Sequence, residues 1–261
     1  MSSGLQFDPE QSRGLELQYK RPQMVQRRAR ALALADPRRG EKAIDIGCGP
    51  GFLCADLAAG VTDSGEVLGI DQSDPMLGLA RARCAEWKHV RIVQADATEL
   101  PVDDAQLDLA TSTQVLEYVD DVDRALGEIA RSLRPGGRAM LLATDWRAVA
   151  WHSSDDDRMQ RVLSAWEEHL AHPALPHTLG LRLERLGLHV THVERHSVLE
   201  RSLDDTGYSA MLTGAIAAFA AGRGGVDEGE AKAWAEDLEA IRARGEYHFS
   251  LGQYFFCAEK S

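Results

Sequence analysis

The sequence predicts an α/β protein in which helices cover both faces of a parallel sheet. From residue 41 onward, short apolar runs of strand length alternate with helical patterns, as is typical of parallel strands joined by helical crossovers. The chain has 261 residues, of which 44% are hydrophobic, enough for a large packed core. Glycines follow the first apolar run directly, at the edge where open α/β sheets bind ligands.

The elements up to residue 145 alternate regularly. We expect strands at 43–46, 67–70, 90–93, 107–110 and 139–143, with helices between them at 52–59, 75–86 and 122–133. After residue 144 this rhythm ends, and we expect helices over 155–171 and 179–186, a strand over 189–196, a helical insertion over 204–244 and an aromatic-rich strand over 247–258. The helix at 155 begins with three aspartates, which suit the positive end of a helix dipole. The second helix of the insertion begins with Asp227 and Glu230 at the spacing of a capping box.

The composition disfavours nucleic acid as a partner. The 29 Lys and Arg against 41 Asp and Glu give a net charge of −12, whereas neutralising phosphates needs a basic surplus. The four cysteines (Cys48, Cys54, Cys84 and Cys257) form no CxxC pair, so we expect free thiols in a reducing compartment. The sequence shows no signal-peptide pattern and no apolar stretch of membrane-spanning length, so we expect a cytoplasmic protein.

Residues 1–40 are polar with a helical pattern and are expected to form an N-terminal cap. They include a basic run at 26–30, Gln-Arg-Arg-Ala-Arg. Such runs are more often solvated helix faces than binding patches, and we interpret this one as a solvated face.

The most informative segment is the turn after the first strand, Asp45-Ile46-Gly47-Cys48-Gly49-Pro50-Gly51. Glycines at alternate positions let the backbone turn sharply and let a ligand approach the main chain. Asp71 lies 20 residues beyond Gly51, at the end of the second apolar run, where a carboxylate can accept hydrogen bonds from both hydroxyls of a ribose. The pattern therefore predicts a nucleoside-containing ligand. Its DxGxGxG spacing differs from the GxGxxG fingerprint of dinucleotide sites.

Further segments extend this pattern in order along the chain. They are Gln72 to Leu77 after Asp71, Asp96 after the third strand, the fourth strand at 107–112, and the Gly136-Gly137 turn before the fifth. Together with the glycine turn, they resemble the class I S-adenosylmethionine-dependent methyltransferases, particularly the ubiquinone/menaquinone C-methyltransferase-like type. The resemblance covers residues 40–145 and implies S-adenosylmethionine as cofactor, with S-adenosylhomocysteine as product.

The resemblance also implies an architecture. It is a Rossmann-like, doubly wound sheet of seven strands, mostly parallel with the last strand antiparallel. We expect it in residues 41–202 and 245–261, with N-terminal helices in residues 1–40 and a helical lid in residues 203–244.

By the same resemblance, the family's cofactor residues fall on defined positions of this chain. The turn from Asp45 to Gly51 would wrap the methionine part of the cofactor. Tyr19 would lie over the cofactor as part of an N-terminal lid; a purely structural role for its ring is weighted equally. The full expected set comprises Tyr19, Asp45, Gly47, Cys48, Gly49, Gly51, Asp71 for the ribose, Gln72, Met76, Asp96 and Ala97 for adenine, and Thr113 and Gln114 for the ammonium and sulfonium groups.

Methyl transfer from a sulfonium needs no metal, and none is expected. A general base is needed only if the acceptor loses a proton as it attacks. The candidate catalytic residues are Glu117, Tyr118 and His152, because they follow the carboxyl ends of the fourth and fifth strands. Asp145, Trp146 and Trp151 share that position. For His152, a surface or capping role is the simpler interpretation.

The acceptor is expected to be a small molecule. The segment after the fourth strand, Ser112-Thr113-Gln114-Val115, lacks the Asn/Asp-Pro-Pro-Tyr-like loop of DNA amino-methyltransferases, and the chain contains no Pro-Cys dipeptide for a cytosine-C5 type. The alternative hypothesis is a non-catalytic S-adenosylmethionine-binding module that docks a partner protein. The sequence leaves open the acceptor, its reacting atom, the use of a base and the oligomeric state.

Overall fold

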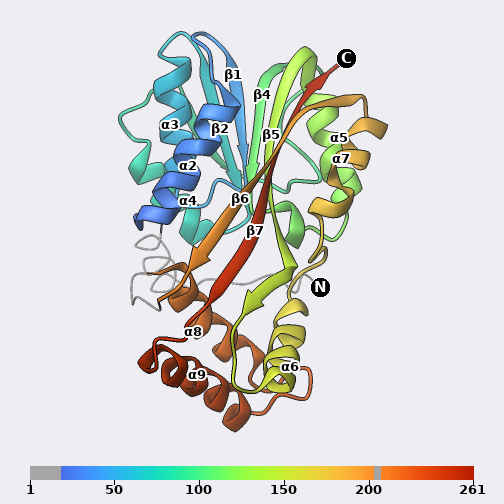
Figure 1. Ribbon diagram of the computed structural model, residues 1–261. Helices are drawn as coiled ribbons and strands as arrows, with labels where there is room; N and C mark the ends of the chain where they lie inside the picture. The colour runs from blue at the N-terminus through green and yellow to red at the C-terminus, as the bar shows by residue number, and fades with distance from the viewer. Residues whose placement is uncertain (1–18, 203–206) are drawn as a thin grey trace.

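The computed structural model describes residues 19–202 and 207–261, and its centre is one seven-stranded sheet (Figure 1). The strand order is β3-β2-β1-β4-β5-β7-β6. The pairs among β1 to β5 are parallel, and β7 runs antiparallel to both of its neighbours, β5 and β6. The predicted doubly wound sheet with an antiparallel last strand is thereby confirmed.

The element bounds follow the predicted order. The strands are β1 (Lys42–Ile46), β2 (Glu66–Asp71), β3 (Val90–Gln94), β4 (Leu107–Thr113), β5 (Leu133–Trp151), β6 (Leu188–Glu200) and β7 (Phe249–Lys260). The helices are α2 (Pro22–Ala35), α3 (Phe52–Val61), α4 (Asp74–Arg83), the 3₁₀ turn η1 (Leu116–Tyr118), α5 (Val122–Ser132), α6 (Asp156–Glu167), α7 (Pro176–Arg185), α8 (Tyr208–Ala220) and α9 (Glu228–Ala243). Residues 1–18 of the expected cap and 203–206 of the expected insertion lie outside the described residues.

Helices cover both faces of the sheet because its strands are apolar on both sides. On one face, α2, α3 and α4 bury side chains such as Leu57 and Leu77 against the strands. On the other face, α5 and α7 bury Leu126 and Leu183. This double cover leaves the carboxyl ends of β1 to β4 at one edge of the sheet, where the segments of the candidate site begin.

A second core lies beyond the carboxyl edge of the sheet, where β5, β6 and β7 extend toward α6, α8 and α9 (Figure 1). The ring centroid of Trp151 lies 5.4 Å from that of Trp234 and 4.7 Å from that of Phe249. Aromatic rings at such spacings contribute contact energy beyond the area they bury. The helices of the expected lid therefore share a packed core with α6 and the ends of three strands.

Local capping explains several helix starts. The Asp227 side chain accepts a hydrogen bond from the Glu230 amide at 2.8 Å, which is one half of the predicted capping box. The Glu230 carboxylate does not return the bond and instead pairs with Arg161 on α6. Helix α6 ends at Glu167, earlier than predicted, and α7 begins at Pro176, a residue favoured in the first turn of a helix. In the described part of the chain, no helix is long and apolar enough to span a membrane.

Candidate functional site

The glycine turn between β1 and α3 has the left-handed backbone of a sharp turn, as its glycines predict. Gly47, Gly49 and Gly51 have φ values of +69°, +51° and +77°, a region that side chains rarely adopt. A Cβ on Gly47 would lie 2.1 Å from a methyl of Val115, and one on Gly51 would lie 2.9 Å from Ala80. At Gly49 the nearest atom to such a Cβ would be the Tyr19 hydroxyl, at 3.6 Å. The turn therefore packs tightly on two sides and leaves room beside Gly49.

Asp45, near the end of β1, fixes the start of this turn through its hydrogen bonds. Its side chain is buried and accepts hydrogen bonds from the Thr111 hydroxyl at 2.8 Å and from the Cys54 thiol at 3.5 Å. Burial raises the pKa of the Asp45 carboxyl to about 7, against the lowering effect of these two donors. Asp45 also lines a cavity beside the turn, so the candidate site contains a titratable carboxyl group.

Asp71 ends β2 and is tied to the glycine turn. Its Oδ2 accepts a hydrogen bond from the Gly49 amide at 2.9 Å, and its Oδ1 accepts one from the Ser73 amide at 2.9 Å. Each carboxylate oxygen has a further lone pair, so both can still accept a ligand hydroxyl. The bond from Gly49 fixes the acid and the turn in one arrangement.

Asp96 follows β3 on the same edge of the sheet as Asp71. Its Oδ2 accepts a hydrogen bond from the Gln72 side chain at 2.8 Å, and its Oδ1 accepts bonds from the amide and hydroxyl of Thr98. Gln72 and Asp96 are both exposed, whereas Met76 and Ala97 beside them are buried. The structure thus brings all four expected adenine-side residues to neighbouring segments, with two side chains accessible and two in the core.

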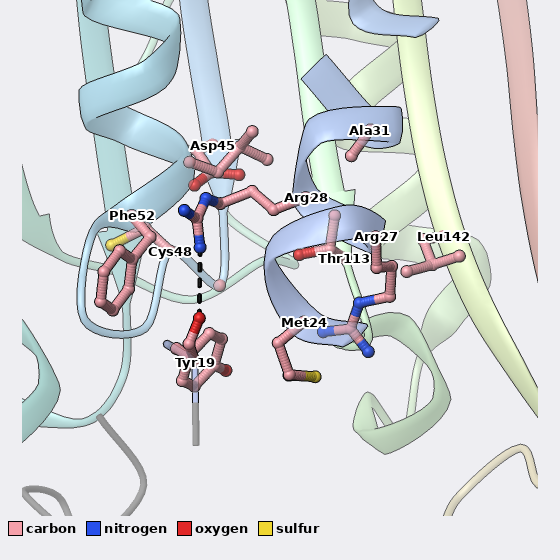
Figure 2. Close-up of a pocket in the computed structure, with 12 residues that line it drawn as sticks. Tyr19, Met24, Arg27, Arg28, Ala31, Asp45, Cys48, Phe52, Thr113 and Leu142 are labelled. Carbon is pink, nitrogen blue, oxygen red and sulfur yellow. Dashed lines mark hydrogen bonds between the residues drawn. The ribbon is translucent and has the colours of Figure 1, made fainter. Parts of the chain in front are cut away.

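The cavity lies between the glycine turn and helix α2 (Figure 2). Its volume is about 30 Å³, and its lining includes Asp45, Gly47, Cys48 and Thr113 of the expected set. Tyr19 closes one side, where its ring stacks on Phe52 with centroids 5.9 Å apart. Asp71 and Asp96 do not line this cavity, so the candidate site consists of a narrow enclosed part and an exposed part along the edge of β2 and β3.

Helix α2 also lines the cavity, and the interpretation of its basic run as a solvated face is wrong for two of the three arginines. Arg27 is only 7% exposed, and both Arg27 and Arg28 line the cavity. The reason is helical spacing, because Met24, Arg27 and Ala31 lie three and four residues apart on one buried face. Only Arg30 points to solvent, where it pairs with Glu194.

A group of polar side chains, which we call the strand-end cluster, gathers where β4 ends, beside Thr144 within β5. Its members are Arg27, Gln114, Glu117, Thr144 and Tyr208. The Gln114 amide nitrogen donates to the Thr144 hydroxyl at 2.9 Å and to the Tyr208 hydroxyl at 3.4 Å, while its oxygen accepts a bond from Arg27. Gln114 does this at a φ of +56°, and non-glycine residues in that region are strained and concentrate at functional sites.

Glu117 is fully buried within this cluster. Its Oε1 accepts a hydrogen bond from the Thr144 amide at 3.2 Å, and its Oε2 has no hydrogen-bond partner among the described residues. Burial raises the pKa of Glu117 to about 7. Glu117 is therefore poised between its charged and neutral forms at neutral pH.

The other two expected catalytic residues lie in different surroundings. Tyr118 follows Glu117 and faces the second core, where its ring lies 5.6 Å from that of His169, and burial raises its pKa well above the usual value. His152 is exposed at the far end of β5, next to the buried Trp151. Thr144 and Trp151 pair with positions four residues apart on β7, so they lie roughly 13 Å apart along the sheet. The structure thus does not bring His152 into the strand-end cluster.

Asp145 and Trp146 have other partners: Asp145 faces the opposite side of β5 from Thr144, because successive residues of a strand alternate, and Trp146 packs in the second core. The buried Asp145 carboxylate lies 2.7 Å from the Nε2 of His177 on α7, and Trp146 packs against Trp166. In residues 19–202 and 207–261, no group of three or more His, Cys, Asp or Glu side chains is placed to hold a metal ion.

Comparison with known proteins finds a methyltransferase domain over much of this site. Residues 44–141 match the methyltransferase domain model, a range that contains the glycine turn, Asp71, Asp96 and the strand-end residues of β4. Demethylmenaquinone methyltransferases are among the similar curated proteins: that of Staphylococcus carnosus is 36% identical over 117 residues, and that of Staphylococcus aureus strain JH9 is 40% identical over 107 residues. These alignments cover 45% and 41% of this chain, and 48% and 44% of the respective relatives.

A further relative is an uncharacterized 37.1 kDa protein of a Streptomyces fradiae transposon, 37% identical over 154 residues, which are 59% of this chain and 44% of that protein. The chain thus spans about half the length, or slightly less, of the curated relatives it matches.

Solved structures share the fold across nearly the whole chain. The YcgJ protein of Bacillus subtilis has a TM-score of 0.64 at 18% identity, with 90% of this chain and 98% of that chain covered. A phosphoethanolamine N-methyltransferase of Haemonchus contortus, bound to S-adenosylmethionine, has a TM-score of 0.62 at 19% identity, with 97% and 57% covered. Residues 44–141 are therefore similar to a methyltransferase domain and to the matching part of demethylmenaquinone methyltransferases, and the chain has the fold of a solved S-adenosylmethionine-bound methyltransferase.

Proposed function

We propose that this protein transfers a methyl group from S-adenosylmethionine to a small-molecule acceptor by in-line displacement. The relatives named demethylmenaquinone methyltransferases support a small organic acceptor. The observation that carries the proposal is the 2.9 Å hydrogen bond between the Gly49 amide and Asp71. This bond holds the glycine turn next to Asp71, the acid expected to bind the ribose, at the carboxyl edge of the sheet, where open α/β folds bind nucleosides.

The residues present suit the cofactor at each end. A Cβ at Gly49 would fill space beside the turn, so the glycine keeps that side open for the methionine part. The spare lone pairs of Asp71 suit the ribose hydroxyls, and the exposed Asp96 suits the adenine amino group. Gln72 would flank the adenine ring from its neighbouring position. Met76 and Ala97 would form the buried apolar surface beneath that ring.

At the reacting end, the protein's task is to align the acceptor and to exclude water. S-adenosylmethionine supplies a methyl group that its sulfonium already activates. Thr113 at the end of β4 and Tyr19 on the opposite wall enclose the cavity where that end would lie. Tyr19 stacks on Phe52 and shields this side from solvent. Alignment in a dry site contributes much of the rate in displacement reactions.

Proton removal from the acceptor, where it is needed, falls to Glu117. Its Oε2 lacks a hydrogen-bond partner among the described residues, and its pKa of about 7 matches that of an efficient general base. Tyr118 keeps its proton at neutral pH because burial raises its pKa well above the usual value. His152 lies outside the strand-end cluster, and we assign it no part in the reaction.

The proposal is tested by incubating the full chain with methyl-labelled S-adenosylmethionine and reduced demethylmenaquinone, alongside a panel of aromatic acids. Mass spectrometry should detect S-adenosylhomocysteine together with one labelled acceptor. The Asp71→Ala variant is the control that removes the ribose contact and should lower product formation. Binding of S-adenosylmethionine without product from any acceptor would contradict methyl transfer and favour a binding module.

A further inference from the structure

Arg27 is a buried cation whose partners are neutral. It is the most buried of the three arginines in the basic run, and its hydrogen-bond partner is the side-chain oxygen of Gln114. By contrast, Arg28 and Arg30 pair with carboxylates, Asp56 at 2.8 Å and Glu194. No ion pair joins Arg27 to a carboxylate within residues 19–202 and 207–261. Arg27 acts to lower the pKa of Glu117, but the two side chains form no ion pair. A buried guanidinium without a direct carboxylate partner costs free energy, which a ligand of opposite charge can recover.

The surroundings of Arg27 are those of a binding site rather than of a structural ion pair. Gln114 presents its oxygen to Arg27 from a strained backbone, and its nitrogen binds Thr144 and Tyr208. Strain at a position that orients a buried cation is typical of sites that are organised for a ligand. Burial raises the pKa of the Tyr208 hydroxyl, with Arg27 acting in the opposite direction. The ring therefore stays a neutral hydrogen-bond donor beside the guanidinium.

Two orphan acceptors complete this region. The Oε2 of Glu117 and the Oε1 of Gln253 are buried and have no hydrogen-bond partner among the described residues. Gln253 reaches the same cluster, since its amide nitrogen donates to the Thr144 hydroxyl at 3.3 Å. A ligand that offers both an anionic oxygen for Arg27 and a hydroxyl or amine for one of these oxygens would satisfy the cluster.

The two arginines of the cavity face different parts of it. Figure 2 shows Arg28 extending toward the glycine turn and Asp45, while Arg27 points to the side of Thr113 and Leu142. The Arg28 guanidinium also donates to the Tyr19 carbonyl at 3.3 Å. Arg28 therefore lies beside the glycine turn, and Arg27 lies on the side of Thr113 and Gln114, where the sulfonium, and with it the reacting atom of the acceptor, would lie.

We infer that the methyl acceptor carries an anionic oxygen group, such as a carboxylate or a phosphate, that pairs with Arg27. This inference rests on the proposed function and specifies its substrate class. Charge balance favours it, because the cofactor brings a positive sulfonium next to a positive guanidinium. An anionic acceptor lowers the net positive charge of this region, and the planar guanidinium can bind two oxygens of such a group at once.

The test measures binding of benzoate and of its neutral isostere benzamide to the wild-type complex with S-adenosylhomocysteine, by calorimetry. Arg27→Met removes the charge at similar length, and Arg30→Met is the matched control on the exposed side of the same helix. We expect benzoate to bind about 30-fold more tightly than benzamide in the wild type and in Arg30→Met, and equally weakly in Arg27→Met. The affinity for S-adenosylhomocysteine should stay the same in all three proteins, which also shows that the variants are folded.

Competition with inorganic phosphate identifies the acid group. Displacement of benzoate by phosphate supports a phosphate-bearing acceptor, and failure to displace it supports a carboxylate. Equal binding of benzoate and benzamide by the wild type would overturn the inference while leaving the proposed function intact. A loss of S-adenosylhomocysteine binding in Arg27→Met would also overturn it, because Arg27 would then serve the cofactor. Failure of the wild type to bind S-adenosylhomocysteine would instead refute the proposed function itself.

Discussion

Replacing Glu117 with glutamine should change how stability depends on pH. Burial raises the pKa of Glu117 to about 7, from 4.5 for a solvated glutamate. A carboxyl whose pKa is raised by folding stabilises the protein below pH 4.5, and this contribution is lost as the pH rises to about 7. With these two pKa values, the wild type should lose about 2.5 kcal/mol between pH 5 and pH 8 through this group. Glu117→Gln cannot ionise and keeps the oxygen that accepts from the Thr144 amide, so it should not show this loss.

The assay is denaturant unfolding of both proteins from pH 5 to pH 8. Asp45 also has a pKa raised by burial to about 7, so the informative quantity is the difference between variant and wild type at each pH. This difference should shift in favour of the variant by about 2.5 kcal/mol, equivalent to roughly 5–10 °C in melting temperature for a chain of this size. A difference that stays constant across the range would refute the raised pKa and, with it, the assignment of Glu117 as a base.

Two further substitutions test the turn and the second core. Gly47→Ala places a Cβ 2.1 Å from Val115 at a positive φ. It should therefore lower the free energy of unfolding by about 2 kcal/mol or more and weaken S-adenosylhomocysteine binding in calorimetry. The control Gly78→Ala has open space at its Cβ and should be neutral or slightly stabilising. Full stability of Gly47→Ala would contradict the packing of the turn. Trp234→Ala removes a fully buried ring and should cost about 3–5 kcal/mol in urea unfolding, and a cost below 1 kcal/mol would show that α9 is not part of the core.

The sheet could be predicted from sequence because its signals are local. Short apolar runs of four or five residues that alternate with helical patterns have few alternatives to a parallel sheet. The length of β5 could not be predicted, since its later part depends on the pairing of residues 144–145 and 150–151 with β7 and on the aromatic core around Trp234. These contacts join residues that are distant in sequence, and periodicity does not reveal them.

In the site, too, local features could be predicted from sequence and contacts between distant segments could not. The glycine turn and Asp71 could be located from sequence because backbone conformation and strand ends dictate them. Arg27 was missed because a run of basic residues is usually solvated, although its spacing from Met24 and Ala31 marks the buried face of α2. The partnership of Arg27 with Gln114 and Tyr208 joins three distant segments and required the fold.

The central claim is that the glycine turn and Asp71 together hold one adenosyl ligand. Calorimetric titration with S-adenosylhomocysteine, and with its analogue lacking the ribose hydroxyls, tests this claim for the wild type, for Asp71→Ala and for the neighbouring control Asp74→Ala. Asp71→Ala should bind S-adenosylhomocysteine about tenfold to a hundredfold more weakly than the wild type and the control do, and should no longer distinguish the two ligands. An unchanged dissociation constant in Asp71→Ala would contradict this claim.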